Sequence, residues 1–460
     1  MIDPALSEAE DPDHAYEIDT LTVSAVLEAV ESGSQTRLKE LLDRQHAADV
    51  ADLLEQISSK DRRALLALWG DEIDGEVLSE VDEGLRAEMF EHLPDAVVTE
   101  AVRELETDDV VDLVEDMDAP QQERLMDALE DADRVAVEQS LQYPEETAGR
   151  LMQRELVMAP PDWSVGDAID HLRGEEDLPE HFYKVMIVNP FLQPVGTVAL
   201  GSLLTSARDT RLSDIMDEDF RVIPALQSQE DVAYAFNQYH MVSAPVVDDE
   251  GRLVGVITID DAMDVLDEEA EEDIMLLAGV LDESLSSSVI ATSKLRFPWL
   301  AVNLATSVLA SIVIAQFAST IEAIVALAVL MPIVASMGGN AGTQTLTVAV
   351  RALATKDLTP ANAWRVIRRE VAVGFFNGCV FALIIGAIGI VWYGSPMLGV
   401  VLGLSMVANL LVAGMAGILI PLGLDKVGVD PALASGAFVT TVTDMIGFFS
   451  FLGLAALILL

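Results

Sequence analysis

One carboxylate lies deep in the last apolar segment of this chain. Asp430-Pro431 is typical of a helix N-cap followed by proline at the first helical position. Asp444 follows 14 residues later, about 21 Å along such a helix. Thr440 and Thr441 precede it by four and three residues and share its face. A buried carboxylate is costly, which favours a functional cation site; the alternative is a protonated Asp444 in a helix–helix hydrogen bond.

A glycine-rich motif supplies further polar groups, since Asn340 and Gln344 share a helical face. Gly338 and Gly342 have the small-xxx-small spacing that permits close helix packing, which is the simpler explanation of the glycines alone. Amide and carboxylate oxygens suit a hydrated Mg²⁺ ion, which needs only one or two carboxylates. We expect an ion-conducting path lined by Asp444, Thr440, Thr441, Asn340, Gln344, Gly338 and Gly339.

The composition divides the chain into two halves. The 460 residues carry a net charge of −51, yet 51% are hydrophobic and the mean hydropathy is +0.36. Residues 291–460 hold six acids and eight bases, whereas residues 1–290 hold 71 acids and 18 bases. An acidic soluble half is therefore expected to precede a membrane half.

The same composition excludes several classes of protein. A strongly negative soluble half repels phosphate backbones, so no nucleic-acid partner is expected. The single Cys379 excludes a disulfide framework. The six histidines are scattered outside the apolar segments, and no nucleophile–base pattern predicts an enzyme. The N-terminus lacks an apolar signal sequence, so the acidic half is expected in the cytoplasm.

Five apolar stretches are long enough to span a bilayer, at 297–317, 321–353, 371–393, 397–422 and 431–460. Pro332 favours a kink in the second. Basic residues precede the first stretch and flank the second-to-third and fourth-to-fifth connections, but are missing from the other two. The positive-inside rule then places the C-terminus outside.

The acidic half divides into helical and mixed parts. Segments such as 47–56, 94–105 and 108–117 have apolar residues at helical spacing. Asp108 and Asp112 lie one helical turn apart, as expected for a solvated face or a cation site. Residues 145–270 hold a repeat of about 60 residues in which each copy predicts strand, helix, strand, turn, strand and helix.

The repeat resembles a tandem pair of CBS domains. In such domains a Thr-x-x-Asp motif can hold an adenosine ribose, and Thr258 and Asp261 match it in the second copy. The corresponding segment of the first copy, 196–202, lacks the motif. The resemblance therefore allows one adenine nucleotide, such as ATP, at the second copy.

Residues 260–273 hold nine acids and no base. Like charges one turn apart destabilise a helix unless cations neutralise them. One interpretation is adaptation to high salt, supported by the six lysines against twenty arginines. The other is a divalent-cation sensor placed before the membrane half. The two interpretations are compatible.

The order of these parts, with the motifs at 331–355 and 430–448, resembles the MgtE family of magnesium channels and transporters. We expect a multidomain chain with an all-α superhelical N-domain, an α/β tandem CBS pair and a polytopic α-helical membrane domain with five spans. The predicted parts are an acidic tail (1–20), the N-domain (21–142), CBS repeats (143–205 and 206–265), a linking plug helix (266–293) and the pore domain (294–460).

The resemblance implies a homodimer whose plug helix closes a central pore when cytoplasmic Mg²⁺ is high. It implies that Asp444 binds hydrated Mg²⁺ beside the backbone of Thr440, with Asn340 in the pore wall. At Glu230, His240 stands where the family has an acidic partner. The acids that the resemblance assigns to regulatory Mg²⁺ are Asp108, Asp112, Glu230, Asp261, Asp264, Glu269, Glu272 and Asp273.

The sequence thus predicts a Mg²⁺-selective, Mg²⁺-gated channel or transporter that mediates uptake across the cytoplasmic membrane. Mg²⁺ would be both the transported and the regulatory ion, the lipid bilayer would surround the pore domain, and no obligate protein partner is evident. Two alternatives stay open. One is a membrane-anchored CBS nucleotide sensor without transport activity, and the other is a proton-coupled divalent-cation antiporter.

Overall fold

The computed structural model describes residues 18–70, 73–103, 105–175, 178–179, 182–280 and 289–460. The chain forms two compact units, Met1–Asp267 and Glu268–Leu460. The predicted acidic tail lies largely outside the described residues, as do positions 281–288 of the predicted plug helix.

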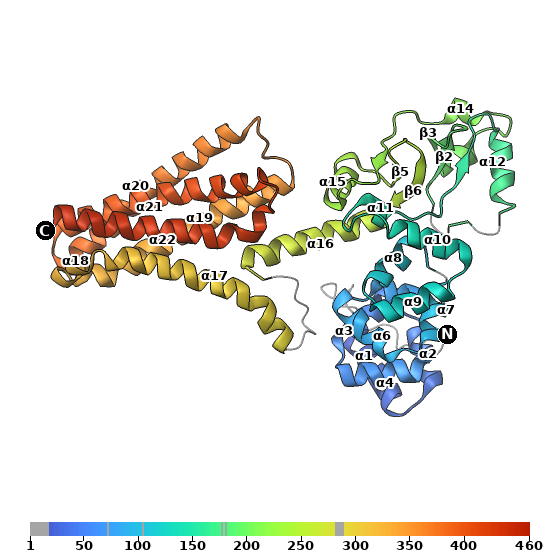
Figure 1. The fold of residues 1–460 in the computed structure, drawn as a ribbon, viewed down its shortest axis with the longest axis horizontal. Coiled ribbons are helices and arrows are strands. Elements are labelled where there is room, and N and C mark those ends of the chain that lie inside the picture. Colours follow the sequence, from blue (N-terminus) through green and yellow to red (C-terminus); the bar gives the residue numbers. More distant parts are fainter. Residues whose placement is uncertain (1–17, 71–72, 104, 176–177, 180–181, 281–288) are drawn as a thin grey trace, which may run out of the picture. The chain divides into compact units, whose positions relative to one another are not determined.

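The first part of the N-terminal unit is entirely helical, as predicted (Figure 1). Acids and serines begin many of these short helices, because their side chains accept hydrogen bonds from first-turn amides, as Asp19 and Ser58 do. Valines and leucines of each helix share one core. The helices are α1 (Thr20–Glu31), α2 (Gln35–Leu42), α3 (Ala47–Gln56), α4 (Ser59–Trp69), α5 (Gly75–Glu80), α6 (Glu83–His92), α7 (Asp95–Val102), α8 (Thr107–Glu115), α9 (Ala119–Ala128) and α10 (Asp131–Ser140).

The predicted repeat is confirmed by two matching three-stranded sheets, ordered β1-β2-β3 and β4-β5-β6. In each sheet the first pair is parallel, the second is antiparallel, and the register shifts at the end of the middle strand. Backbone bridges Gln153–Val256 and Thr197–Asp217 join the two copies. The elements are α11 (Ala148–Leu151), β1 (Met158–Ala159), α12 (Val165–Leu172), β2 (Lys184–Val188), β3 (Pro194–Ala199), α13 (Leu200–Thr205), α14 (Leu212–Ile215), β4 (Ile223–Pro224), α15 (Gln229–Tyr239), β5 (Ser243–Val247) and β6 (Leu253–Thr258).

Helix α16 (Ile259–Ala278) carries the acidic run from the first unit into the second. The five predicted spans are confirmed as helices long and apolar enough to cross a membrane. The break before the second span differs from the prediction, because the backbone leaves the helix at Ile324 within a largely apolar run. The helices are α17 (Val289–Ala315), α18 (Ala318–Ala323), α19 (Ala326–Ala354), α20 (Ala363–Tyr393), α21 (Pro396–Asp425) and α22 (Pro431–Ile458).

Helix α21 packs against α19, α20 and α22, and is the most buried of the five spans (Figure 1). Glycines allow the backbones to touch: a Cβ on Gly417 would lie 2.6 Å from the carbonyl oxygen of Gly342. The fully buried Asn409 lies beside Gly338 of α19 and Gly447 of α22. Its Nδ2 donates to the Val334 carbonyl at 2.7 Å. This amide therefore fixes the junction of three helices.

Gly338→Ala tests this junction. The new Cβ would lie 2.2 Å from Nδ2 of Asn409, which is buried and cannot swing away. We expect a lower melting temperature in detergent, because overpacking costs about 1–3 kcal/mol. Gly423→Ala in α21 is the matched control, since nothing lies within 4 Å of its new Cβ. Equal melting temperatures for the two variants would contradict the proposed packing.

Candidate functional site

Carboxylates from two parts of the first unit meet where α8 faces the start of α16. The electrostatic influence of Asp261 reaches both Asp108 and Asp109. Asp264 likewise acts on Glu80, which ends α5. We call this set the acidic interface: Glu80, Glu106, Asp108, Asp109, Asp260, Asp261 and Asp264.

Burial and mutual repulsion make these carboxylates hard to ionise. Burial, with the charges of Glu155 and Asp109, raises the pKa of Glu106 to about 7. Burial and the charge of Asp261 raise the pKa of Asp109 to about 7 and that of Asp108 well above its usual range. Burial also raises the pKa of Asp261 to about 6, although hydrogen bonds from Thr258 oppose the shift. Positive charge at this interface would relieve a large electrostatic penalty.

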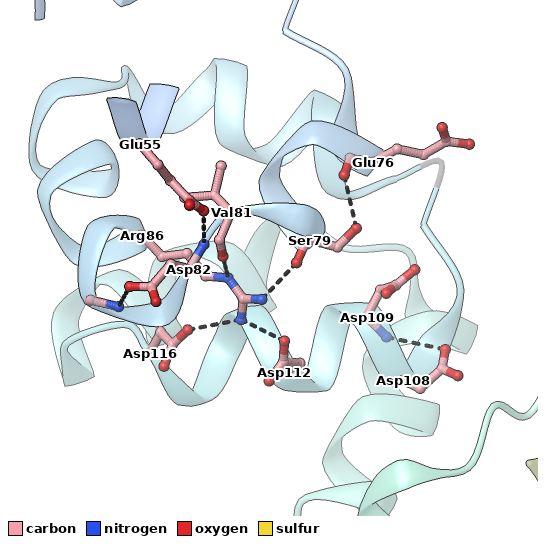
Figure 2. Close-up of polar contacts among 11 residues, drawn as sticks. Glu55, Glu76, Ser79, Val81, Asp82, Arg86, Asp108, Asp109, Asp112 and Asp116 are labelled. Atoms are coloured by element: carbon pink, nitrogen blue, oxygen red, sulfur yellow. Dashed lines mark hydrogen bonds and ion pairs between the residues drawn. The ribbon is translucent and has the colours of Figure 1, made fainter. Parts of the chain in front are cut away.

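The buried Arg86 is already committed to other partners (Figure 2). Its Nη1 lies 2.5 Å from Oδ2 of Asp112 and 3.0 Å from Oδ2 of Asp116. Its Nε donates to the carbonyl of Val81. Figure 2 shows that Asp108 and Asp109 lie at the start of α8, away from this guanidinium. Asp112, predicted as the partner of Asp108, is thus an ion-pair partner of Arg86.

Polar contacts hold the start of α8 against the first CBS copy. Glu155 accepts hydrogen bonds from the hydroxyl of Thr107 at 2.6 Å and from its backbone amide at 3.2 Å. The side-chain amide of Gln153 donates to Glu106. The backbone of Gln153 also pairs with Val256 of β6, the strand that leads into α16. These contacts bring Glu106 and its neighbours close to Asp261.

Sequence reasoning missed Glu80, Glu106, Asp109 and Asp260. Glu106 and Asp109 flank Asp108 in sequence, so the run Glu-Thr-Asp-Asp before an apolar helix was the available signal. The four-residue spacing from Asp108 instead predicted Asp112, whose side chain is half-exposed and pairs with Arg86. The position of Glu80 depends on how α5 packs, and no local pattern predicts it.

Thr258 and Asp261 form a hydrogen-bonded unit at the end of β6. The Thr258 hydroxyl donates to Oδ2 of Asp261 at 2.7 Å, and its backbone amide donates to the same oxygen at 3.1 Å. The sheet registers place Ala199 of the first copy at the position of Thr258, in line with the predicted lack of a motif there. A neighbouring cavity, lined in part by Tyr183 and Ser243, measures about 10 Å³ and has no room for a nucleotide as it stands.

The predicted pairing of Glu230 with His240 is wrong within one chain. Glu230 lies in the first turn of α15, whereas His240 is its C-cap with a left-handed backbone, φ 51°. The two residues are ten positions apart, about 15 Å along the helix. A single ion cannot contact both side chains at that separation.

Asp444 is half-buried on α22 and has no hydrogen-bond or ion-pair partner among the residues the structure describes. The hydroxyls of Thr440 and Thr441 donate to carbonyls of their own helix, which leaves the lone pairs of both oxygens able to accept hydrogen bonds. Gly339 faces Thr440, with 4.0 Å between a Cβ built on the glycine and Cγ2 of the threonine. The predicted residues Gly339 and Thr440 therefore come together, whereas Gly338 packs against Asn409; Asn340 is exposed on the same stretch of α19.

The linking helix ends against the membrane helices of its unit. Leu276 is buried with Leu346 and Val350 of α19 and Val439 of α22, and Leu277 packs beside them. The predicted regulatory acids Glu269, Glu272 and Asp273 lie on the same helix. This apolar contact joins the last turn of α16 to α19 and α22.

The acidic interface offers only oxygen ligands, as Mg²⁺ prefers. Within the described ranges, no three Asp, Glu, His or Cys side chains are already arranged to hold a metal ion. The donor chemistry therefore fits Mg²⁺, and side-chain adjustment or coordinated water would complete the ligand set.

Comparisons with known proteins cover nearly the whole chain. Residues 331–454 match the MgtE family of divalent cation transporters, residues 45–146 the MgtE intracellular N domain, and residues 212–268 the CBS domain. A magnesium transporter MgtE from Thermus thermophilus is 33% identical over 94% of this chain and 97% of its own length. A second, from Enterococcus faecalis, is 36% identical over 70% of this chain and 71% of its own length.

A solved structure is similar to the first unit. It is the cytosolic domain of the Mg²⁺ channel MgtE in complex with ATP, with a TM-score of 0.50 and 30% identity. The match covers 53% of this chain and 99% of the solved one. The identity and coverage of the relatives, together with the five membrane helices, show that the chain belongs to the MgtE family of divalent cation transporters.

Proposed function

We propose that the chain conducts Mg²⁺ into the cell across the cytoplasmic membrane and that cytosolic Mg²⁺ closes it. The relatives, which are named magnesium transporters, support Mg²⁺ as the transported ion. The acidic interface carries the gating part of the proposal, because its carboxylates lie together with Arg86 paired elsewhere. The chain acts as a homodimer, with its N-terminal unit in the cytoplasm and its C-terminus outside.

Closure depends on whether the carboxylates of the interface can stay together. Without divalent cations, Asp109 and Asp261 repel each other across the boundary between N-domain and CBS pair. Bound Mg²⁺ supplies the positive charge that offsets this repulsion. Asp108 and Asp264 then hold α8 and α16 together from either side. Each bridge need contribute only about 1–3 kcal/mol if several act jointly.

Helix α16 transmits this change in the proposed mechanism. Its first turns carry Asp260, Asp261 and Asp264, and its last turn contacts α19 and α22 through Leu276 and Leu277. Glu269, Glu272 and Asp273 lie between, where further Mg²⁺ ions would hold the helix in its closed position. One helix thus joins the regulatory carboxylates to the pore helices, as coupling between two sites requires.

Asp444 is the residue that recognises the conducted ion. It presents one carboxylate beside the backbone of Thr440, with Asn340 on α19, whereas Gln344 of α19 lines a cavity with Glu370 and Asn377. A hydrated Mg²⁺ ion would bind there through its waters, since Mg²⁺ gives up its hydration shell reluctantly. A second copy of the chain would complete the pore wall.

An adenine nucleotide is a second ligand of the CBS pair in this proposal. The similar cytosolic domain was solved with ATP, and Thr258 and Asp261 are held together here as a ribose-binding pair would be. The small cavity beside them must widen for a nucleotide to enter. Because Asp261 also belongs to the acidic interface, nucleotide and Mg²⁺ would act on the same carboxylate.

Asp444→Asn tests the ion pathway. Removing the one carboxylate while keeping its shape should reduce Mg²⁺ uptake into proteoliposomes to the level of empty vesicles. Glu322→Gln, an exposed position on α18, is the matched control and should keep wild-type uptake. Wild-type uptake by folded Asp444→Asn protein would refute the role of Asp444.

The double variant Glu106→Gln, Asp109→Asn tests the acidic interface. Neutral amides neither repel nor bridge, so Mg²⁺ should lose its effect on docking. In limited proteolysis of the full chain, the ratio of cleavage rates without and with Mg²⁺ should fall towards one. Glu123→Gln, Asp127→Asn removes two exposed charges from the same domain and should keep the wild-type ratio. An unchanged ratio in the first variant would contradict the assignment.

The raised pKa values also predict a pH dependence. Docked carboxylates with a pKa of about 7 bind protons more tightly than they do when separated, so their docking without Mg²⁺ is favoured at low pH. It should be lost as the pH rises through about 7. Hydrogen exchange in α8, corrected for intrinsic rates, should therefore speed up over this range in Mg²⁺-free buffer and stay slow with Mg²⁺. Exchange that is independent of pH would contradict the proposed repulsion.

A further inference from the structure

A polar cavity lies between α19 and α20, on the side of α19 that faces away from Thr440. It measures about 180 Å³ and has room for several water molecules. Helices α19 and α20 make little direct contact, since each packs mainly against α21, which forms the cavity floor with Leu410 and Gly414. Small residues at Ala341, Gly374 and Gly414 leave the space open.

Four polar side chains line this cavity: Gln344, Thr345, Glu370 and Asn377. The hydroxyl of Thr345 lies 3.5 Å from Oε2 of Glu370, which is half-buried. No Lys or Arg is among the described residues that line it. A carboxylate and two amides within membrane helices are costly unless water or an ion meets them. The cavity therefore needs a polar occupant.

We propose that this cavity is a second site for a hydrated divalent cation, separate from Asp444. Glu370 supplies the single negative charge, while Gln344, Thr345 and Asn377 accept hydrogen bonds from the water shell of the ion. The absence of a basic lining residue disfavours a phosphate or another anion. Gln344 lies one helical turn from Asn340 along α19, and the cavity adds a second ion site to the membrane domain.

The test uses the full chain with its single cysteine removed by Cys379→Ala. Val373→Cys then places a thiol in the cavity wall and leaves the four polar side chains intact. A water-soluble methanethiosulfonate reagent should label this thiol, and Mg²⁺ should slow the labelling severalfold at constant ionic strength. Adding Glu370→Gln should abolish this protection, whereas adding Asp444→Asn should preserve it.

Trp364→Cys, an exposed position at the start of α20, reports any general effect of Mg²⁺ on labelling. Four results would overturn the proposal: no labelling of Val373→Cys, no protection by Mg²⁺, equal protection at position 364, or protection that survives Glu370→Gln. Loss of protection in Asp444→Asn would also overturn it, because the two sites would then be one. Mg²⁺ uptake by the Asp444→Asn protein is measured separately. Lost protection of the thiol would count against the second site, whereas retained uptake would count against the proposed pore.

Discussion

The repulsion among buried carboxylates at the acidic interface is the constraint on which the first unit depends. Glu106, Asp109 and Asp261 are brought together by well-formed elements: the start of α8, which Glu155 holds at Thr107, and the end of β6 with the first turn of α16. The nearby guanidinium of Arg86 neutralises Asp112 and Asp116 instead. Protons therefore favour the docked arrangement, and added cations are proposed to do the same. That conditional stability is what a cation sensor needs.

The second unit is under the opposite constraint, because charged side chains are costly within a membrane and their number must stay small. Glycine contacts and the buried amide of Asn409 join α19, α21 and α22 without ionic groups. Against this apolar background, Asp444 and Glu370 are conspicuous, and each lies on a helix that contacts α21. In the proposed mechanism, the membrane unit uses few carboxylates to attract a hydrated ion, whereas the first unit uses many to respond to it.

Local patterns predicted the parts of this molecule that depend on local chemistry. Helical periodicity, the 60-residue repeat and five apolar runs gave the fold class, and Asp444 was evident because it interrupts an apolar helix. Residues that act through tertiary neighbours were missed. Asp109 is adjacent in sequence to Asp108, yet only the packing of α8 against α16 shows its importance. The same holds for Asn409 and Glu370, whose roles depend on facing helices.

The salt-adaptation and sensing interpretations remain compatible, since exposed acids and the acidic interface are different residues.

In the proposed mechanism, Mg²⁺ inside the cell controls its own entry. This can be tested by measuring Mg²⁺ flux through the purified full chain in oriented proteoliposomes, with internal Mg²⁺ varied from none to saturating at constant ionic strength. Gating by the acidic interface predicts flux that is highest without internal Mg²⁺ and falls steeply as internal Mg²⁺ rises. Flux that is independent of internal Mg²⁺ would contradict gating by the acidic interface, and no flux at any internal Mg²⁺ would contradict the transport function itself.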